Sequence, residues 1–334
     1  MMKLRIFTAS DRRFFPLFNG LLNSIEAART QHLGLLYRRT PHCPIDNIEV
    51  VLFDVGLLPH MVREAEERGV FVVPTRDIDP RLFYGDSYHD SLTPASLSLL
   101  VRPILPRFRG DADVLVYVDA DIWFTDCVAL EDFVWAASKH TLAVVPETGR
   151  ICAYGKFARE VIDVQWFDTE KYFGPGSADG LANLPLLNAG FVAAEPDNPF
   201  WEYWHRAMRE ALERNDGMCE FGIDQCALNY VVYTKSLRFT PLPFSHNYCV
   251  SQAYPVVRGG RLCFPTIPFE PIHALHMTGN TKFQRVPVKV VDDSGTAVNQ
   301  VQAYLDYRSV QELTQDLKAI ECSPMGKQKI EVVR

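Results

Sequence analysis

Hydrophobic positions near the start of the chain follow two alternating spacings. Segments 3–9, 48–53 and 70–73 are short and mostly apolar, whereas segments 19–37 and 59–68 place apolar residues at the helical spacing. Strand, helix, strand, helix, strand in this order is the pattern of βαβ units. We therefore expect the α/β fold class, with a mostly parallel central sheet flanked by helices.

An unbroken apolar run at 114–118 ends in two acids, Asp119 and Asp121, with Ala120 between them. A run without polar alternation predicts a strand that is covered on both faces. Residues two apart in a strand point to the same side, so the two carboxylates repel each other unless a cation lies between them. Oxygen ligands of this kind suit magnesium, manganese or calcium. The alternative is a polar turn with both acids solvated, and the D-x-D spacing alone does not decide.

Strand and helix signals continue along the chain. Thr93-Pro94 is a helix start, because a hydroxyl can cap the helix and proline suits its first position. Further strands are predicted at 142–145, 186–192, 237–240 and 272–275, and further helices at 130–138, at 199–214, from 222 onward and at 299–318. Two late features complete the pattern: a turn at 292–295 and a polar tail at 325–334.

The segment 150–186 has the least regular pattern in the chain. It contains G-P-G-S-A-D-G at 174–180, which is not a dinucleotide fingerprint because the spacing differs and a proline intrudes. We interpret this segment as a flexible loop and as a candidate lid over a site.

Composition narrows the function classes. A formal net charge of −7 argues against sequence-independent nucleic-acid binding, and an anionic substrate would need local cations. We find neither a signal-peptide pattern nor an apolar run long enough to span a bilayer. The eight cysteines are scattered without a C-x-x-C motif, which favours reduced thiols in a cytoplasmic protein over a zinc site.

Four motifs then follow one another in plausible strand and helix contexts. They are Asp119-x-Asp121, Asn188-Ala189-Gly190, Asp224-Gln225 with Leu228-Asn229, and His276-x-x-Gly279-x-x-Lys282. In this order they resemble the pattern of glycosyltransferase family 8, the lipopolysaccharide galactosyltransferase and glycogenin type. The resemblance covers roughly residues 3 to 285.

The resemblance implies a fold, a reaction and partners. It implies a GT-A domain at 1–285, a single catalytic domain, followed at 286–334 by an extension with one packing helix and a polar tail. It implies a hexosyltransferase that uses Mn²⁺ or Mg²⁺ and a nucleotide-sugar donor, in most cases a UDP-sugar. The acceptor would be a glycan, a lipid-linked molecule or a protein, and the anomeric configuration would be retained.

The resemblance also assigns roles to residues. The metal ligands would be Asp119, Asp121 and His276, and the catalytic residues would be Asn188, Asp224 and Gln225. The donor-binding residues would be Thr8, Ala9, Ser10, Asp11, Arg102, Asp119, Ala120, Asp121, Glu147, Asn188, Ala189, Gly190, Gly279 and Lys282. An amide is a poor nucleophile, so we expect same-face substitution, with the diphosphate acting as base, in preference to double displacement through Gln225.

The chain departs from the family pattern in two places. Phe283-Gln284 stands where the family has proline-tryptophan after the final lysine, and the segment 150–186 is long and specific to this chain. Each motif residue alone also has a structural explanation. The dipole of a helix first turn favours Asp224, and His276 and its neighbour His273 could be hydrogen-bonded structural histidines.

Other functions remain as alternatives. A nucleotidyltransferase of related fold normally has a glycine-rich basic loop after the first strand, whereas Ser10-Asp11-Arg12-Arg13-Phe14 contains no glycine. A sugar-binding or scaffold protein would keep the fold without catalysis. An inverting transferase would need a carboxylate base beside the acceptor. Lys327, Lys329 and Arg334 could touch a membrane surface peripherally, although clusters of four or more charges are usual there.

Overall fold

The computed structural model describes residues 2–35, 45–89, 93–147, 149, 156–292 and 294–321. The described residues form two compact units, each built from segments that are separate in the sequence. The first unit comprises Met1–Phe18, Leu35–Ala120 and Leu130–Phe244, and the second comprises Asn19–Gly34, Asp121–Ala129 and Ser245–Arg334.

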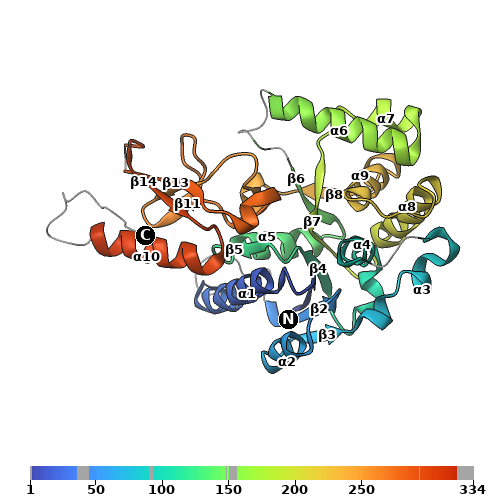
Figure 1. Cartoon of the computed structure of the whole chain (residues 1–334), viewed down its shortest axis with the longest axis horizontal. Helices are drawn as coiled ribbons and strands as arrows, with labels where there is room; N and C mark the ends of the chain where they lie inside the picture. Colours follow the sequence, from blue (N-terminus) through green and yellow to red (C-terminus); the bar gives the residue numbers. More distant parts are fainter. Residues whose placement is uncertain are drawn as a thin grey trace. The chain divides into compact units, whose positions relative to one another are not determined.

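A seven-stranded sheet forms the centre of the first unit (Figure 1). Its strands are β1 (Met2–Ser10), β2 (Ile45–Asp54), β3 (Phe71–Val73), β4 (Val114–Val118), β6 (Leu142–Pro146), β7 (Leu187–Ala194) and β8 (Phe239–Pro241), in the order β3-β2-β1-β4-β7-β6-β8. Strand β7 is antiparallel to both of its neighbours, β4 and β6, and the other strand pairs are parallel. The predicted α/β class with a mostly parallel sheet is confirmed.

Helices on both sides bury the sheet. They are α2 (Pro59–Glu67), α3 (Arg81–Tyr84), α4 (Pro94–Leu100), α5 (Val128–Ala137), α6 (Lys156–Phe173), α7 (Pro175–Leu181), α8 (Phe200–Arg214) and α9 (Ile223–Thr234), with 3₁₀ turns at Thr75–Ile78, Gly85–Ser87, Arg102–Phe108 and Phe244–His246. Helix α5 begins in the second unit. All five residues of β4 are buried, as its unbroken apolar run predicts.

The predicted start of α4 is confirmed in detail. The Thr93 hydroxyl accepts a hydrogen bond from the Ser96 backbone N–H at 3.0 Å, and the Ser96 hydroxyl accepts one from the Thr93 backbone N–H at 3.0 Å. This reciprocal pair is a capping box, and Pro94 occupies the first turn.

The flexible loop predicted at 150–186 is wrong where the structure describes it. Helices α6 and α7 fill most of this segment, and residues 150–155 lie outside the described residues. The buried face of α6 carries Gln165 and Thr169, so its helical period is not visible as an apolar stripe. Gly174 has a φ of 86° and separates the two helices, and Pro175 then stands in the first turn of α7.

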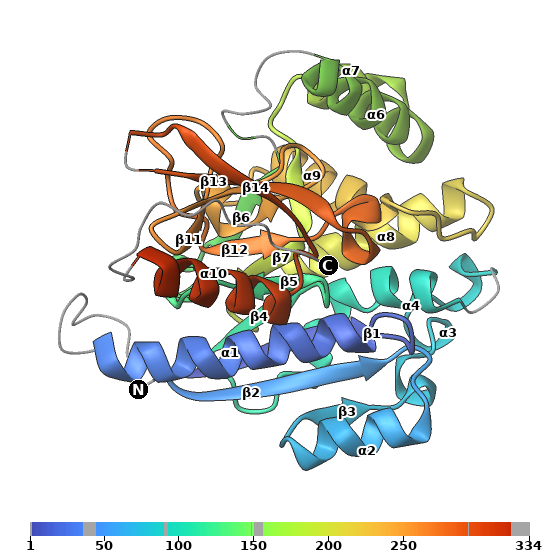
Figure 2. The same cartoon turned by 60° about the vertical axis from the view of Figure 1, so that its left-hand side comes forward.

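The second unit contains two small sheets and two long helices. The helices are α1 (Phe15–Leu35), which begins in the first unit, and α10 (Tyr307–Glu321), and a 3₁₀ turn lies at Gly279–Phe283. One sheet has the strand order β5 (Ile122–Phe124), β12 (Ala274–His276), β9 (Tyr248–Cys249). The other has the order β11 (Arg261–Cys263), β10 (Val256–Arg258), β13 (Val286–Val291), β14 (Ala297–Ala303). Helices α1 and α10 lie side by side (Figure 2). A Cβ at Gly20 would be 3.4 Å from the Cβ of Tyr307, so the two helices approach each other closely at this point.

The helix predicted at 299–318 begins later than expected. Residues Ala297–Ala303 form β14, which pairs antiparallel with β13, and α10 starts only at Tyr307. The pairing with β13 satisfies the backbone groups that a helix would otherwise use. The polar tail predicted at 325–334 lies outside the described residues.

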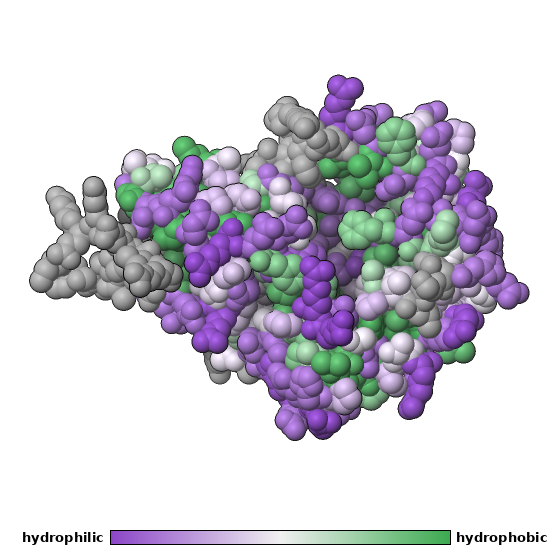
Figure 3. Space-filling model, viewed as in Figure 1, coloured by the Kyte–Doolittle hydropathy of each residue, from purple (hydrophilic) through white to green (hydrophobic). Residues whose placement is uncertain are grey.

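No helix within the described ranges is long and apolar enough to cross a membrane. On the face that Figure 3 shows, hydrophobic residues form separate patches among hydrophilic ones.

Candidate functional site

The topology of the first unit brings strand ends from distant parts of the chain to one edge of the sheet. Strands β1 and β4 are parallel, so both end at this edge. Strand β7 is antiparallel to β4, with Val118 opposite Phe191, and therefore begins there. Strand β6 ends there too, because Pro146 pairs with Leu187. Ligands of open α/β sheets bind outside the carboxyl ends of the parallel strands.

Arg102 joins two acids at this edge. One guanidinium nitrogen donates to Asp224 Oδ2 at 2.5 Å and the other donates to Asp119 Oδ1 at 2.6 Å. The three side chains are 9%, 2% and 20% exposed, in the order Arg102, Asp224, Asp119. The guanidinium also lies 4.8 Å from the centre of the Tyr117 ring. Burial alone would lower the pKa of Arg102, but Asp119 and Asp224 together raise it, so the cation is permanent.

The Gln225 amide is held at both of its ends. Its oxygen accepts a hydrogen bond from the Ala189 backbone N–H at 3.1 Å, and its nitrogen donates to Glu147 Oε2 at 2.7 Å. Gln225 lies in the first turn of α9, which Gly222 enters with a φ of 88°. An oriented amide of this kind positions the carboxylate beside it and is a weak nucleophile.

The Asn188-Ala189-Gly190 segment supports the backbone of the D-x-D motif. The Gly190 carbonyl accepts a hydrogen bond from the Asp119 backbone N–H at 2.7 Å. The Asn188 side-chain oxygen accepts one from the Gly190 N–H at 2.9 Å, and Asn188 is 5% exposed. One turn beyond Gln225, Asn229 exchanges hydrogen bonds with both backbone groups of Leu187. Hydrogen bonds within the first unit therefore join Asp119 to the Asn188-Ala189-Gly190 motif, that motif to Gln225, and the preceding Leu187 to Asn229.

The last three residues of β1 are buried, and Asp11 follows them directly. Thr8, Ala9 and Ser10 are 0%, 7% and 1% exposed. The Asp11 carboxylate accepts hydrogen bonds from the backbone N–H groups of Arg13 and Phe14, both at 2.8 Å. Asp11 thus caps the turn that leads into α1, which gives it a structural role whatever it contacts besides.

In the second unit, Asp121 lies beside a histidine and a lysine. Strands β5 and β12 are antiparallel with Ile122 opposite His276, which brings His276 to Asp121. His276 Nε2 is 3.5 Å from Asp121 Oδ1, and Lys282 Nζ is 2.5 Å from Asp121 Oδ2. Asp121 is 3% exposed and its predecessor Ala120 is 4% exposed. A nearly buried carboxylate is therefore accompanied by an imidazole nitrogen and an ammonium group.

Asn247 orients His276 and is a residue that the sequence does not point to. Its side-chain oxygen lies 3.0 Å from His276 Nδ1, and it is 1% exposed. An Nδ1–H that donates to Asn247 leaves the lone pair on Nε2, the nitrogen beside Asp121. By contrast, His273 pairs with Asp126 at 2.9 Å, which is the structural role expected for it.

Gly279 and Lys282 lie on the 3₁₀ turn that follows β12. Gly279 has a φ of 62°, and no described atom lies within 4 Å of where its Cβ would be. The backbone at this position is thus open to close approach by a ligand.

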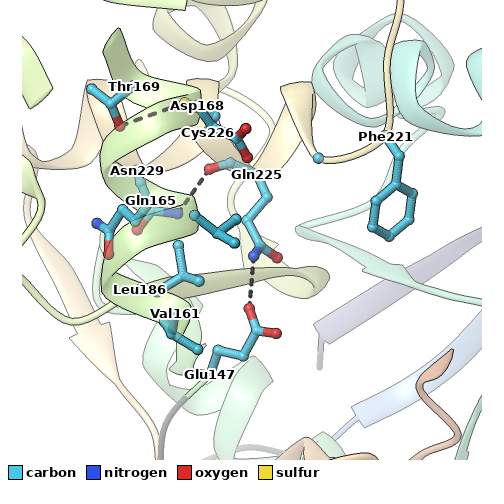
Figure 4. A pocket seen from close by; sticks show the side chains of 12 residues that line it. Glu147, Val161, Gln165, Asp168, Thr169, Leu186, Phe221, Gln225, Cys226 and Asn229 are labelled. Atoms are coloured by element: carbon cyan, nitrogen blue, oxygen red, sulfur yellow. Dashed lines mark hydrogen bonds between the residues drawn. The ribbon is translucent and has the colours of Figure 1, made fainter. Parts of the chain in front are cut away.

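A cavity of about 350 Å³ adjoins Gln225 and Glu147 in the first unit (Figure 4). Its lining residues are Glu147, Val161, Val164, Gln165, Asp168, Thr169, Leu186, Phe221, Gly222, Gln225, Cys226 and Asn229. The residues from 161 to 169 were missed as site residues because the sequence pattern there predicts a loop. An apolar stripe at the helical spacing would have indicated a helix here, but the sequence of α6 lacks one.

No protein-family profile matches the chain, and no curated protein sequence matches it. Among solved structures, the chain is similar to the bifunctional glycosyltransferase WbbM in its apo form, with 15% sequence identity and a TM-score of 0.49 over 84% of this chain. This chain spans 46% of that WbbM chain.

The chain is also similar to the galactosyltransferase LgtC in complex with donor and acceptor sugar analogues. The sequence identity is 15% and the TM-score 0.48, over 83% of this chain and 88% of that one. An active-site mutant of LgtC matches at 15% identity and a TM-score of 0.49, over 82% and 87% of the two chains.

Proposed function

We propose that this protein is a metal-dependent glycosyltransferase that transfers a hexose from a UDP-sugar to an acceptor hydroxyl with retention of anomeric configuration. One observation carries the proposal: Asp121, two residues after Asp119 at the end of β4, is accompanied in its own unit by both His276 and Lys282. A nucleoside diphosphate leaving group is stabilised by positive charge. Lys282 carries such a charge, and Asp121 and His276 can bind a metal cation that adds more.

The donor set suits a divalent cation. Asp119, Asp121 and His276 each offer one ligand atom, two carboxylate oxygens and one imidazole nitrogen. Such a mixed oxygen and nitrogen set fits manganese better than calcium, and it also accepts magnesium. Asp119 and Asp121 are separated only by Ala120, so the covalent chain keeps both carboxylates near each other. When bound, the metal supplies Lewis-acid neutralisation of the diphosphate.

The side chains of the second unit bind and neutralise the diphosphate in this proposal. The Lys282 ammonium, which now pairs with Asp121, adds a positive group for a phosphate oxygen. The open backbone at Gly279, three residues earlier, permits a phosphate to approach closely.

Arg102 has a positioning role in this proposal in place of the donor contact that the sequence predicts. Both ends of its guanidinium bind the carboxylates of Asp119 and Asp224. It therefore fixes Asp119 in one orientation. Arg102 also neutralises part of the negative charge of Asp119 and Asp224, so it limits the repulsion between these two carboxylates.

Same-face substitution agrees best with the environment of Gln225. The acceptor oxygen forms a bond to the anomeric carbon while the bond from that carbon to the diphosphate oxygen breaks, and the acceptor proton passes to the departing diphosphate. Gln225 has its amide nitrogen on Glu147 and its oxygen on Ala189, so it orients groups around the sugar and does not attack.

Thermal denaturation of the full chain with UDP and manganese tests the proposal. A ligand at a hundred times its dissociation constant adds about 2.7 kcal/mol, which is a clear rise in melting temperature. We expect UDP to stabilise the protein only with manganese, and Asp121→Asn to abolish the shift. Asp197→Asn, at an exposed first-unit position, is the control. If no nucleotide raises the melting temperature, the proposal fails and a non-catalytic scaffold role replaces it.

A further inference from the structure

The cavity beside Gln225 has a wall of hydrocarbon. Val161 and Val164 contribute from α6, Leu186 from the position just before β7, and Phe221 from the turn before α9. Val164 is 55% exposed and Phe221 is 94% exposed. Its volume of about 350 Å³ is within the range of small-molecule sites. Exposed apolar side chains that line a cavity gain free energy when a hydrocarbon ligand covers them.

Most polar side chains of the lining already bond to the protein. Gln165 donates to the Leu181 carbonyl at 3.1 Å, and the Thr169 hydroxyl lies 3.7 Å from Cys226 Sγ. Asn229 bonds to the backbone of Leu187. Gln225 bonds to Glu147, as Figure 4 shows. Apart from the Asp168 carboxylate, the lining offers a sugar ring few further partners, so several of its hydroxyl groups would lose hydrogen bonds, which is costly. The cavity is thus better suited to an apolar group than to a sugar.

The polar end of the cavity belongs to the candidate site. Figure 4 shows the Gln225 and Glu147 side chains pointing toward each other, with Val161 and Leu186 also lining the cavity. Gln225 follows Asp224, the partner of Arg102, directly in the first turn of α9. A reactant in the cavity would therefore have its polar end beside residues assigned to the reaction. The donor is polar throughout, which leaves the acceptor.

We propose that this cavity binds the apolar part of an amphiphilic acceptor, a molecule that carries a hydroxyl on a hydrocarbon aglycone. Its hydroxyl lies toward Glu147 and Gln225, and its hydrocarbon covers Val164, Leu186 and Phe221. This inference rests on the proposed glycosyltransferase function and specifies the class of its acceptor. A purely hydrophilic glycan acceptor would gain nothing from these walls.

Calorimetric titration of the full chain with two matched glycosides tests the inference. The probes are octyl β-glucopyranoside, below the concentration at which it forms micelles, and methyl β-glucopyranoside. We expect the octyl compound to bind at least about tenfold more tightly, since burial of hydrocarbon is the main favourable term. Equal affinities for the two probes would overturn the proposal.

Two variants of α6 locate the binding. Val164→Glu places a charge in the cavity wall, and we expect it to weaken octyl glucoside binding by at least about tenfold. Ile162→Glu is the matched control, because Ile162 is 41% exposed on the same helix and does not line the cavity. Loss of binding in both variants, or in neither, would show that the alkyl chain binds elsewhere.

Titration of the same samples with UDP and manganese separates the two proposals. Nucleotide binding without alkyl binding overturns only the amphiphilic acceptor and keeps the transferase. Alkyl binding without nucleotide binding overturns the transferase and, with it, the role of the cavity as an acceptor site. Retained nucleotide binding in Val164→Glu, with alkyl binding lost, supports both.

Discussion

The guanidinium of Arg102 donates to Asp224 Oδ2 across 2.5 Å, and the two side chains are only 9% and 2% exposed. The second nitrogen of the same guanidinium binds Asp119 at 2.6 Å. Removing charges from water is expensive, and their mutual attraction compensates only while every partner is present. Arg102 is therefore the residue on which the charge balance of two acids in the first unit depends.

We expect Arg102→Met to lower the free energy of unfolding by about 3–5 kcal/mol, because it leaves Asp119 and Asp224 without their cation. Urea denaturation of the full chain measures this change. The control is Arg109→Met, since Arg109 pairs with Asp197 at 2.5 Å but the two side chains are 50% and 89% exposed. An exposed pair contributes about 1 kcal/mol or less. Equal losses in the two variants would contradict a buried charge network.

His276 and His273 make a matched pair for the metal proposal. We expect His276→Ala to weaken manganese binding, measured by calorimetry, by at least about tenfold, because it removes one ligand, the imidazole that Asn247 orients. His273→Ala removes a histidine of the same strand region that bonds Asp126 instead, so manganese affinity should stay within about twofold of wild type. Similar losses in both variants would mean that the effect is structural.

The central strand and its two acids were predictable because the pattern that defines them is local. Segment 114–118 is uninterrupted, and Asp119 and Asp121 follow it directly. The partners of these acids were not predictable in the same way. Arg102 and Asp224 are 122 positions apart, and only the pairing of distant elements reveals that they touch. Asn247 gave no signal, because a lone asparagine outside a motif has no periodicity.

Helix α6 shows a second limit of sequence patterns. Its buried face includes Gln165 and Thr169, while Phe167 is 62% exposed and Val164 is 55% exposed. Across residues 164–169, apolar residues outside and polar residues inside invert the pattern from which a helix is usually predicted, whereas Tyr172 and Phe173 at the end of the helix are buried. The same inversion supports a ligand-binding role, since conflicts between local pattern and fold concentrate at functional sites.

The side-chain carboxyl group of Asp168, which lines the cavity, makes the stability of the protein depend on pH. Burial raises its pKa, although Lys171 lowers it and Glu220 adds to the rise. A carboxyl group with a raised folded-state pKa contributes stability below its unfolded value, about 3.9, and this contribution is lost as the pH rises through the folded value. We therefore expect Asp168→Asn to gain stability relative to wild type as the pH rises from about 4 to about 6.

Melting temperatures of wild type and Asp168→Asn across that pH range measure the effect. Asp163→Asn is the control, since Asp163 lies on the same helix with its side chain 58% exposed. A constant difference between wild type and Asp168→Asn at every pH would show that the pKa of this half-buried carboxyl is not raised.

Gln225→Glu tests whether the amide holds Glu147 in place. The change keeps an oxygen for the Ala189 N–H but replaces the donor that now lies 2.7 Å from Glu147 Oε2 with a second carboxylate oxygen. Two carboxylates at this distance cannot both ionise cheaply, so the pKa of one must rise. Its stabilising contribution is then present below about pH 4.3 and is lost as the pH rises through the raised folded value.

We accordingly expect the stability of Gln225→Glu to fall relative to that of Gln225→Ala as the pH rises from about 4 to about 8, as followed by urea denaturation. Gln225→Ala is the proper reference, because it also removes the hydrogen bond to Glu147 and adds no charge. Parallel pH profiles for the two variants would mean that the new carboxylate turns away from Glu147. In that case the Gln225 amide would not be what positions Glu147. Same-face substitution would then lose the support that it draws from the hydrogen bond between Gln225 and Glu147.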